Sequence, residues 1–201
     1  MPDRDAALAE LAASVRHLID ATVSVDGDPA LLRAAARGVD ALTADLRRAV
    51  PDPPPPRYPG GGDTPMAFFP YDYVIGRCNP LAPPIEMRWQ DPLAVGEVTF
   101  GTPYEGPPGC VHGAVIAAAF DQVLNVANLM SGNAGPTARL AMRYRRPTPL
   151  RRPVRFEGWV TQREDRKVHS AGRLLVDDVV TVEAEGLYII VDPERVVNLL
   201  G

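Results

Sequence analysis

One carboxylate stands within an otherwise apolar segment in the middle of the chain. Asp121 is the single ionisable side chain among residues 114–130, and a His-Gly pair, His112 and Gly113, comes directly before this segment. A carboxylate can act as a general base or a nucleophile, and free N–H groups at the start of a helix can stabilise an oxyanion. The segment therefore carries two groups that suit attack on an activated acyl carbonyl.

The spacing of these residues favours a site that two chains share. Asp121 follows His112 by nine positions. On one α-helix this spacing corresponds to roughly 13 Å along the axis and to opposite faces. One copy therefore cannot bring both residues to the same carbonyl. A two-fold dimer, in which Asp121 of one copy approaches Gly113 of the other, would complete the site.

The hydrophobic period predicts the elements that must position these groups. Residues 114–130 are typical of a buried core helix, and after them the period changes from about 3.6 to about 2. Apolar and polar side chains alternate in residues 137–146, which predicts a strand buried on one face. Further candidate strands cover residues 85–90, 96–101, 153–160, 166–176 and 179–191.

Short turns between the later strands predict an antiparallel sheet. A parallel neighbour would need a crossover of about a dozen residues, so successive strands are expected to pair with each other. One long helix and several antiparallel strands predict an α+β fold in which the sheet wraps around the helix. Four helix alanines are expected to let the curved sheet close over the helix: Ala114, Ala117, Ala118 and Ala119.

The first part of the chain has a different character. Apolar residues recur at helical spacing in residues 1–50, with Asp28 and Pro29 placed as a helix cap and a first-turn proline, which predicts a helical hairpin. Residues 51–65 are rich in proline and contain three consecutive glycines, which is typical of an extended linker. The main domain is therefore expected to cover residues 66–201.

Composition excludes several classes of function. The formal net charge is -4, so the chain lacks the basic surface that binding to nucleic acid requires. There are only two cysteines and no leader pattern opens the chain, which indicates a cytoplasmic protein. The apolar segment is shorter than the roughly 20 residues of a membrane span and contains several polar residues, so no membrane span is expected.

Four stretches together resemble a known family. They are "YEGPPGCVHGAVIAAAFDQVL", "TARLAMRYRRPTPL", "EDRKVHSAGRL" and "VEAEGLY", and the likeness extends from about residue 71 to residue 192. The pattern resembles the hotdog-fold acyl-CoA thioesterases of the PaaI and THEM4-like group, within the 4-hydroxybenzoyl-CoA thioesterase superfamily. The family usually has a second glycine where Ala114 stands, and often an Asn or Gln where Gly106 stands.

The resemblance implies a hotdog fold, an acyl-CoA substrate, and a homodimer or a dimer of dimers with shared sites. It implies no cofactor apart from the CoA that is part of the substrate. Asp121 would act as general base or nucleophile, and the Gly113 N–H as oxyanion donor. His112 would orient the thioester or fix its loop by a hydrogen bond. Thr137 resembles the family's hydroxyl that positions water or substrate.

Structural explanations compete with these roles. Asp121 alone could be a core carboxylate bonded to backbone or to a Tyr, and Thr137 a β-branched residue favoured in strands. A Cys110 thiol nucleophile is disfavoured, because no activating helix start precedes it. Arg166 and Lys167 are the favoured ligands for the CoA phosphates. The alternatives are Arg143, Arg145 and Arg146, or simply solvated strand faces.

Three functions remain open from the sequence. The first is hydrolysis of an acyl-CoA to free acid and CoA. The second is an acyl-CoA-binding hotdog module without catalysis, for which Ala114 and Gly106 leave room. The third is a hotdog hydratase or dehydratase, which the Gly113-Ala114 pair after the histidine disfavours. His169 is expected to be an exposed strand residue, and no residues have metal-ligand spacing.

Overall fold

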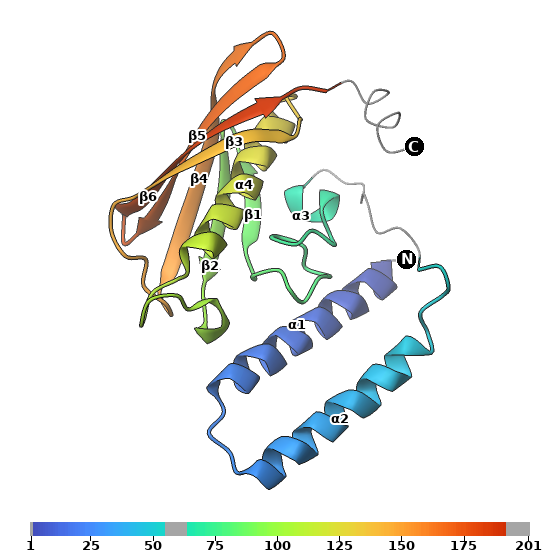
Figure 1. The fold of residues 1–201 in the computed structure, drawn as a ribbon. Coiled ribbons are helices and arrows are strands. Elements are labelled where there is room, and N and C mark those ends of the chain that lie inside the picture. Colours follow the sequence, from blue (N-terminus) through green and yellow to red (C-terminus); the bar gives the residue numbers. More distant parts are fainter. Residues whose placement is uncertain (1, 55–63, 192–201) are drawn as a thin grey trace.

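A six-stranded antiparallel sheet wraps around one long helix, and two further long helices and one short helix lie outside it (Figure 1). The computed structural model of the protein describes residues 2–54 and 64–191. The helices are α1 (Pro2–Ser24), α2 (Pro29–Arg47), α3 (Pro65–Phe68) and α4 (Gly113–Met130), with a 3-10 turn η1 (Thr102–Tyr104). The strands are β1 (Glu86–Gln90), β2 (Leu93–Thr99), β3 (Thr137–Tyr144), β4 (Pro153–Glu164), β5 (Lys167–Val176) and β6 (Val179–Ile189). The α+β class and the hotdog arrangement predicted from the sequence are confirmed.

The order of strands corrects one prediction. The sheet runs β1-β2-β4-β5-β6-β3, so β3 pairs with β6 at an edge and not with β4, the next strand in the chain. Residues 145–152 pass the loop before α4 instead. The Val111 N–H donates to the Thr148 carbonyl at 2.8 Å, and the Leu150 N–H donates to the Gly109 carbonyl at 2.9 Å. These bonds hold residues 145–152 against the loop before α4. The chain therefore leaves β3 at the sheet edge, and β4 lies in the middle of the sheet, between β2 and β5.

The edge position also changes the expected burial of β3. Its half-buried residues are Leu140, Ala141 and Met142, and the other five are exposed. A register shift between Thr137 and Arg139 interrupts the alternation that the sequence suggested. In a single copy of the chain, β3 is therefore largely exposed on both faces.

Glycines in the sheet permit the close contact with α4. Gly158 of β4 pairs with Gly172 of β5. A Cβ at Gly158 would lie 2.8 Å from Val123 Cγ1, and one at Gly172 would lie 3.1 Å from Leu124 Cδ2. Such separations are shorter than ordinary Cβ contacts, so a larger residue at either position would push against the side chains of α4. The sheet therefore supplies the small residues where the two layers meet.

The helix alanines contribute less to this contact than predicted. Ala119 is fully buried, whereas Ala117 and Ala118 are half-buried and Ala114 is exposed. The prediction was wrong for Ala114, whereas Ala118 packs against the core and Ala117 is partly covered. Nine residues of α4 are buried, although its length and composition alone would also suit a membrane span.

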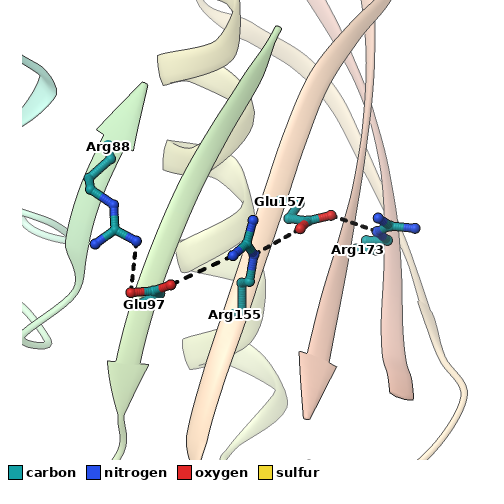
Figure 2. A network of polar contacts seen from close by, with 5 residues as sticks. All are labelled: Arg88, Glu97, Arg155, Glu157 and Arg173. Atoms are coloured by element: carbon teal, nitrogen blue, oxygen red, sulfur yellow. Dashed lines mark hydrogen bonds and ion pairs between the residues drawn. The ribbon is translucent and has the colours of Figure 1, made fainter. Parts of the chain in front are cut away.

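Ionic side chains cover part of the sheet face turned away from α4 (Figure 2). Glu157 of β4 accepts from Arg155 Nε at 2.8 Å and from Arg173 Nε at 2.7 Å, and its side chain is only 7% exposed. Glu97 of β2 joins the same row through Arg88 Nη2 at 2.8 Å and Arg155 Nη1 at 3.8 Å. The row links β1, β2, β4 and β5 side by side.

Both helices predicted in the first fifty residues are present, and they are covered to different degrees. α1 lies against the domain, with Ala12 buried and Arg16 donating to the Asn79 carbonyl at 3.0 Å. Asp28 caps α2 as expected, accepting from Ala30 N and Leu31 N at 2.8 Å each. α2 has no buried residue. Residues 55–63 of the predicted linker lie outside the described residues, and the boundaries at 50/51 and 65/66 stay predictions.

Candidate active site

The first turn of α4 leaves one backbone donor free. The His112 N–H donates to the Tyr104 carbonyl at 2.8 Å, and the Ala114 N–H donates to His112 Nδ1 at 3.0 Å. The Val115 N–H donates to the His112 carbonyl at 3.0 Å. Among the described residues, no acceptor is bonded to the Gly113 N–H. The positive end of the helix is thus open to an acceptor at one position, which is Gly113.

His112 is therefore the N-cap of α4. Its backbone is extended, with φ of -63° and ψ of 133°, and its ring accepts at Nδ1. A ring that accepts at Nδ1 is neutral and carries its proton on Nε2. This geometry agrees with the expected role of fixing the loop by a hydrogen bond. The exposed ring leaves the Nε2–H free to contact a ligand as well.

Asp121 lies on the outward side of α4 and is half-buried. Its Oδ1 accepts a hydrogen bond from Thr137 Oγ1 at 2.7 Å, across from the start of β3. Tyr188 bonds to the Asp121 backbone carbonyl at 3.2 Å and does not bond to its carboxylate. Burial, and then the charge of Asp121, raise the pKa of Tyr188 well above its usual value. The Asp121 carboxylate is thus held by Thr137, and it lies outside the buried core.

One chain keeps Asp121 and Gly113 apart. α4 is continuous from Gly113 to Met130. The eight-residue separation therefore corresponds to about 12 Å along the axis. The helix between them carries small residues that are not fully buried: Ala114, Ala117 and Ala118. The structure brings Thr137 to Asp121, but it does not bring Asp121 to Gly113 within a single copy.

Gly106 has a steric reason to be glycine. A Cβ at this position would lie 2.8 Å from His112 Cα and 3.1 Å from His112 Cβ. The loop and the residues before α4 run closely side by side, with a bridge between Glu105 and Val111. The side-chain amide that the family often carries here has no room in this loop, and position 106 supplies no such group.

An open groove of about 470 Å³ lies beside Gly113. Its walls are mostly apolar and include Pro107, Cys110, Val111, Ile116, Tyr144 and Pro147. Tyr144 Oη donates to the Gly113 carbonyl at 2.8 Å. From the sequence, this tyrosine was expected only to lie on one face of a strand. Its proximity to Gly113 depends on β3 returning along α4, which no local pattern reports.

The candidate CoA ligands lie at different ends of the sheet. Arg166 and Lys167 are exposed at the turn between β4 and β5, in a polar groove that also contains Glu164 and Asp165. Arg145 and Arg146 line the groove beside Gly113, and Arg145 forms an ion pair with Glu183 at 2.7 Å. Arg143 is exposed on β3.

Two further residues were singled out from the sequence. His169 is half-buried on β5 and not exposed as expected, because its strand lies inside the sheet. Cys110 is half-buried in the loop before α4, where its N–H donates to the Pro107 carbonyl at 2.9 Å. No group of three or more His, Cys, Asp or Glu in residues 2–54 and 64–191 could hold a metal ion.

The arrangement of sheet, central helix and helix-start donor defines a hotdog protein, and comparison with known proteins gives the family. The model of the thioesterase superfamily matches residues 108–183. The crystal structure of a thioesterase superfamily protein is 33% identical, with a TM-score of 0.81, and the match covers 91% of this chain and 90% of that one. The chain therefore belongs to the thioesterase superfamily.

Other relatives match the hotdog region. The acyl-coenzyme A thioesterase THEM4 of Bos taurus is 35% identical over 98 residues, which are 47% of this chain and 40% of THEM4. The chain thus aligns with less than half of that curated relative. Thioesterase superfamily member 2 of zebra fish shares the fold, with a TM-score of 0.50 and 13% identity, over 53% of this chain and 81% of that one.

Proposed function

We propose that the protein is an acyl-CoA thioesterase that hydrolyses an acyl-CoA to free acid and CoA. The observation that carries this proposal is the single unpaired N–H of Gly113 on the same helix as the outward-facing carboxylate of Asp121. Membership of the thioesterase superfamily supports it, and so does the name of the bovine relative, acyl-coenzyme A thioesterase.

In the proposed reaction, Asp121 accepts a proton from a water molecule whose oxygen attacks the thioester carbonyl carbon. The Gly113 N–H stabilises the negative charge that develops on the carbonyl oxygen. The C–S bond then breaks, and the CoA sulfur takes the proton from Asp121. Thr137 keeps one carboxylate oxygen in place, so the other can face the reacting centre.

Asp121 could also attack the carbonyl carbon directly. That step would release the CoA thiolate and leave a mixed anhydride, which water would then hydrolyse to the free acid. Under single-turnover conditions in water enriched in ¹⁸O, label in the Asp121 carboxylate would indicate the anhydride. Label in the product acid alone fits both routes, because water can also attack the substrate carbonyl of the anhydride. An acyl adduct on Asp121, sought by mass spectrometry after rapid acid quenching, then separates the two routes.

The site would lie between two copies of the chain. Because Asp121 and Gly113 are about 12 Å apart along α4, a second helix alongside must bring its own Asp121 to Gly113. The small side chains on the outward side of α4 and the exposed edge strand β3 are surfaces that such a copy could cover. We therefore propose a homodimer as the smallest active unit. Pairing of two such dimers would leave these sites intact.

We further propose that the protein works in the cytoplasm. Cys78 and Cys110 are both free thiols, and burial raises the pKa of Cys78. Free cysteines suit a reducing compartment. Expression with a fluorescent tag at either end, followed by fractionation, tests this location.

The first experiment is a panel of acyl-CoA substrates read with a thiol reagent. Asp121→Asn should lower kcat by about 10²-fold or more, the scale of lost general-base catalysis, with the fold retained. Asp40→Asn, on the exposed surface of α2, is the matched control and should keep full activity. Wild-type activity in Asp121→Asn would refute the proposed role. Binding of acyl-CoA without thiol release by the wild-type protein would indicate the binding module, and addition of water to an enoyl-CoA would indicate the hydratase.

The second experiment tests the shared site by complementation. Asp121→Asn chains and Gly113→Val chains, each inactive alone, are mixed under conditions that allow exchange. A heterodimer contains one doubly defective site and one intact site, so activity should return in up to about a quarter of all sites. Verified heterodimers without recovery would mean that the shared-site mechanism is wrong and that His112 and Asp121 have separate roles.

Arg166 and Lys167 are proposed to hold the phosphates of CoA. Their joint replacement by Ala should raise KM several-fold and leave kcat nearly unchanged, because they would bind ground state and transition state alike. The matched control is Arg146→Ala in the groove beside Gly113. A larger rise in KM for Arg146→Ala would indicate that the CoA phosphates bind beside Gly113, at the other end of the sheet.

A further inference from the structure

Among the described residues, two side chains bond to the peptide between Gly113 and Ala114, and they are Tyr144 and His112. Its hydroxyl donates to the Gly113 carbonyl at 2.8 Å. The N–H of the same peptide, which belongs to Ala114, donates to His112 Nδ1 at 3.0 Å. The peptide is thus held at both its oxygen and its nitrogen by side chains from different elements.

The preceding peptide is held at its oxygen only. The His112 carbonyl accepts from the N–H groups of Val115 at 3.0 Å and Ile116 at 3.3 Å. Its nitrogen is that of Gly113, the donor proposed for the oxyanion. The Gly113 N–H lies in the plane of this preceding peptide. The backbone angles of Gly113 set how that plane is oriented relative to the next peptide, and glycine has no Cβ to restrict those angles.

The space around Gly113 fits this arrangement. A Cβ on Gly113 would lie 3.3 Å from Tyr144 Oη, so the hydroxyl occupies the position closest to the glycine. Tyr144 also lines the groove beside Gly113 and is 51% exposed. Its ring thus faces the space that a ligand at Gly113 would enter.

Strand β3 bonds to α4 at both of its ends. Thr137 at its start bonds to Asp121, and Tyr144 at its end bonds to Gly113. One edge strand therefore contacts both the proposed base and the proposed oxyanion donor. Burial raises the pKa of Tyr144 above its usual value, so the phenol keeps its proton and remains a donor throughout the neutral range.

We propose that Tyr144 is a positioning residue, which holds the peptide between Gly113 and Ala114 and thereby keeps the neighbouring Gly113 N–H pointed at the substrate oxyanion. This inference rests on the proposed thioesterase function. Tyr144 acts through Gly113 and does not itself exchange protons with the substrate.

Tyr144→Phe removes the hydroxyl and keeps the ring. It should lower kcat by about tenfold or more, since a misplaced donor loses much of its effect on the transition state, and KM should change less than about twofold. The amide proton of Ala114 should exchange with solvent faster, because its peptide has lost one of its two holds. Tyr73→Phe, which removes the hydroxyl of an exposed tyrosine in another loop, is the matched control and should change neither quantity.

A double-mutant cycle with Gly113→Ala decides whether Tyr144 acts through Gly113. The added methyl group would lie 3.3 Å from the hydroxyl and should push it away from the Gly113 carbonyl, so each single variant weakens the same contact, and the double variant should lose little more than Tyr144→Phe alone. Independent effects that multiply in the double variant would overturn the proposal. It would also fail if Tyr144→Phe has wild-type kcat and Ala114 exchange, or if only KM changes.

The failure of the proposed function is a separate outcome. If the wild-type protein hydrolyses no acyl-CoA, that function is wrong, and the exchange of the Ala114 amide still reports whether Tyr144 holds the peptide. If Tyr144→Phe does not fold, the cycle is repeated with Tyr144→Trp, which keeps an aromatic ring without the phenol. Folded Tyr144→Trp with wild-type kcat and exchange would then refute the positioning role.

Discussion

Helices α4 and α2 have nearly the same length but differ in what covers them. α4 has 18 residues and nine of them are buried, whereas α2 has 19 residues and none is buried. The large apolar side chains of α2 are exposed by 38% to 56%: Leu31, Leu32, Val39, Leu42 and Leu46. A row of apolar residues along a helix thus indicates that one face can be buried. It does not show that another part of the same chain packs against that face.

The same contrast extends to the polar groups. In the sheet, Glu157 is shielded between two arginines (Figure 2). At the end of α2, Asp45 and Arg48 form an ion pair with each other, and their side chains are 65% and 72% exposed. Water screens the second pair and competes for its hydrogen bonds. Matched substitutions in the two regions should therefore have different effects on stability.

The largest difference is expected for a leucine in each helix. Leu124→Ala in α4 should lower the free energy of unfolding by about 2–5 kcal/mol, because it leaves a cavity under the sheet. Leu42→Ala in α2 should change it by less than about 0.5 kcal/mol, since Leu42 is 48% exposed. Urea denaturation of both variants measures the difference. Equal losses of stability in the two variants would contradict the exposure of α2. They would indicate that its apolar residues are buried in an interface.

A smaller difference is expected for the ionic groups. Glu157→Gln keeps the shape of the side chain but removes the charge that faces Arg155 and Arg173. It should lower the free energy of unfolding by about 1–2 kcal/mol, at the lower end for buried charged pairs because the arginines are partly exposed. Asp45→Asn should cost less than about 0.5 kcal/mol. Repeating both measurements in high salt should reduce the second effect more than the first, and the reverse order would show that Glu157 is open to solvent.

The smallest effects are expected at the two helix caps. His112→Ala should lower the free energy of unfolding by about 1 kcal/mol, because the N–H of Ala114 loses its acceptor. Asp28→Ala should instead fray the start of α2, which reduces the helical circular dichroism but hardly moves the unfolding midpoint. His112→Asn, which keeps a cap acceptor, is the control for the first change. A shift of the midpoint by Asp28→Ala as large as that of His112→Ala would show that α2 unfolds together with the sheet.

The sequence predicted the two ends of the candidate site because both depend on local patterns. A His-Gly pair before an apolar run indicates a helix start, and the length of that run fixes how far Asp121 lies from Gly113. It also predicted Thr137 as a candidate hydroxyl, which the structure places on Asp121. The roles of these residues in catalysis stay predictions, and the experiments above test them.

Other features could not be read from the chain, since they depend on which strands become neighbours. The contact of Tyr144 with Gly113 exists because β3 lies at the sheet edge beside β6 and returns along α4. The pairing of Gly158 with Gly172 needs a register between β4 and β5 that many sequences could satisfy. Such contacts join residues that are distant in the chain, so no short window contains both partners.

The sequence by itself determined the kinds and extents of the elements: a long apolar helix with one carboxylate, strands with alternating residues, and an amphipathic helix with its Asp28 cap. These follow from the preferences of neighbouring residues, which act over one or two turns or a single strand. Only the tertiary structure decided that glycines of the sheet admit α4 closely, that Ala114 stays exposed while Ala119 is buried, and that Gly113 keeps the one free N–H of the first turn. The physical reason is that close packing and hydrogen-bond partnership are settled between elements, where a single short contact or one occupied acceptor decides which group remains available.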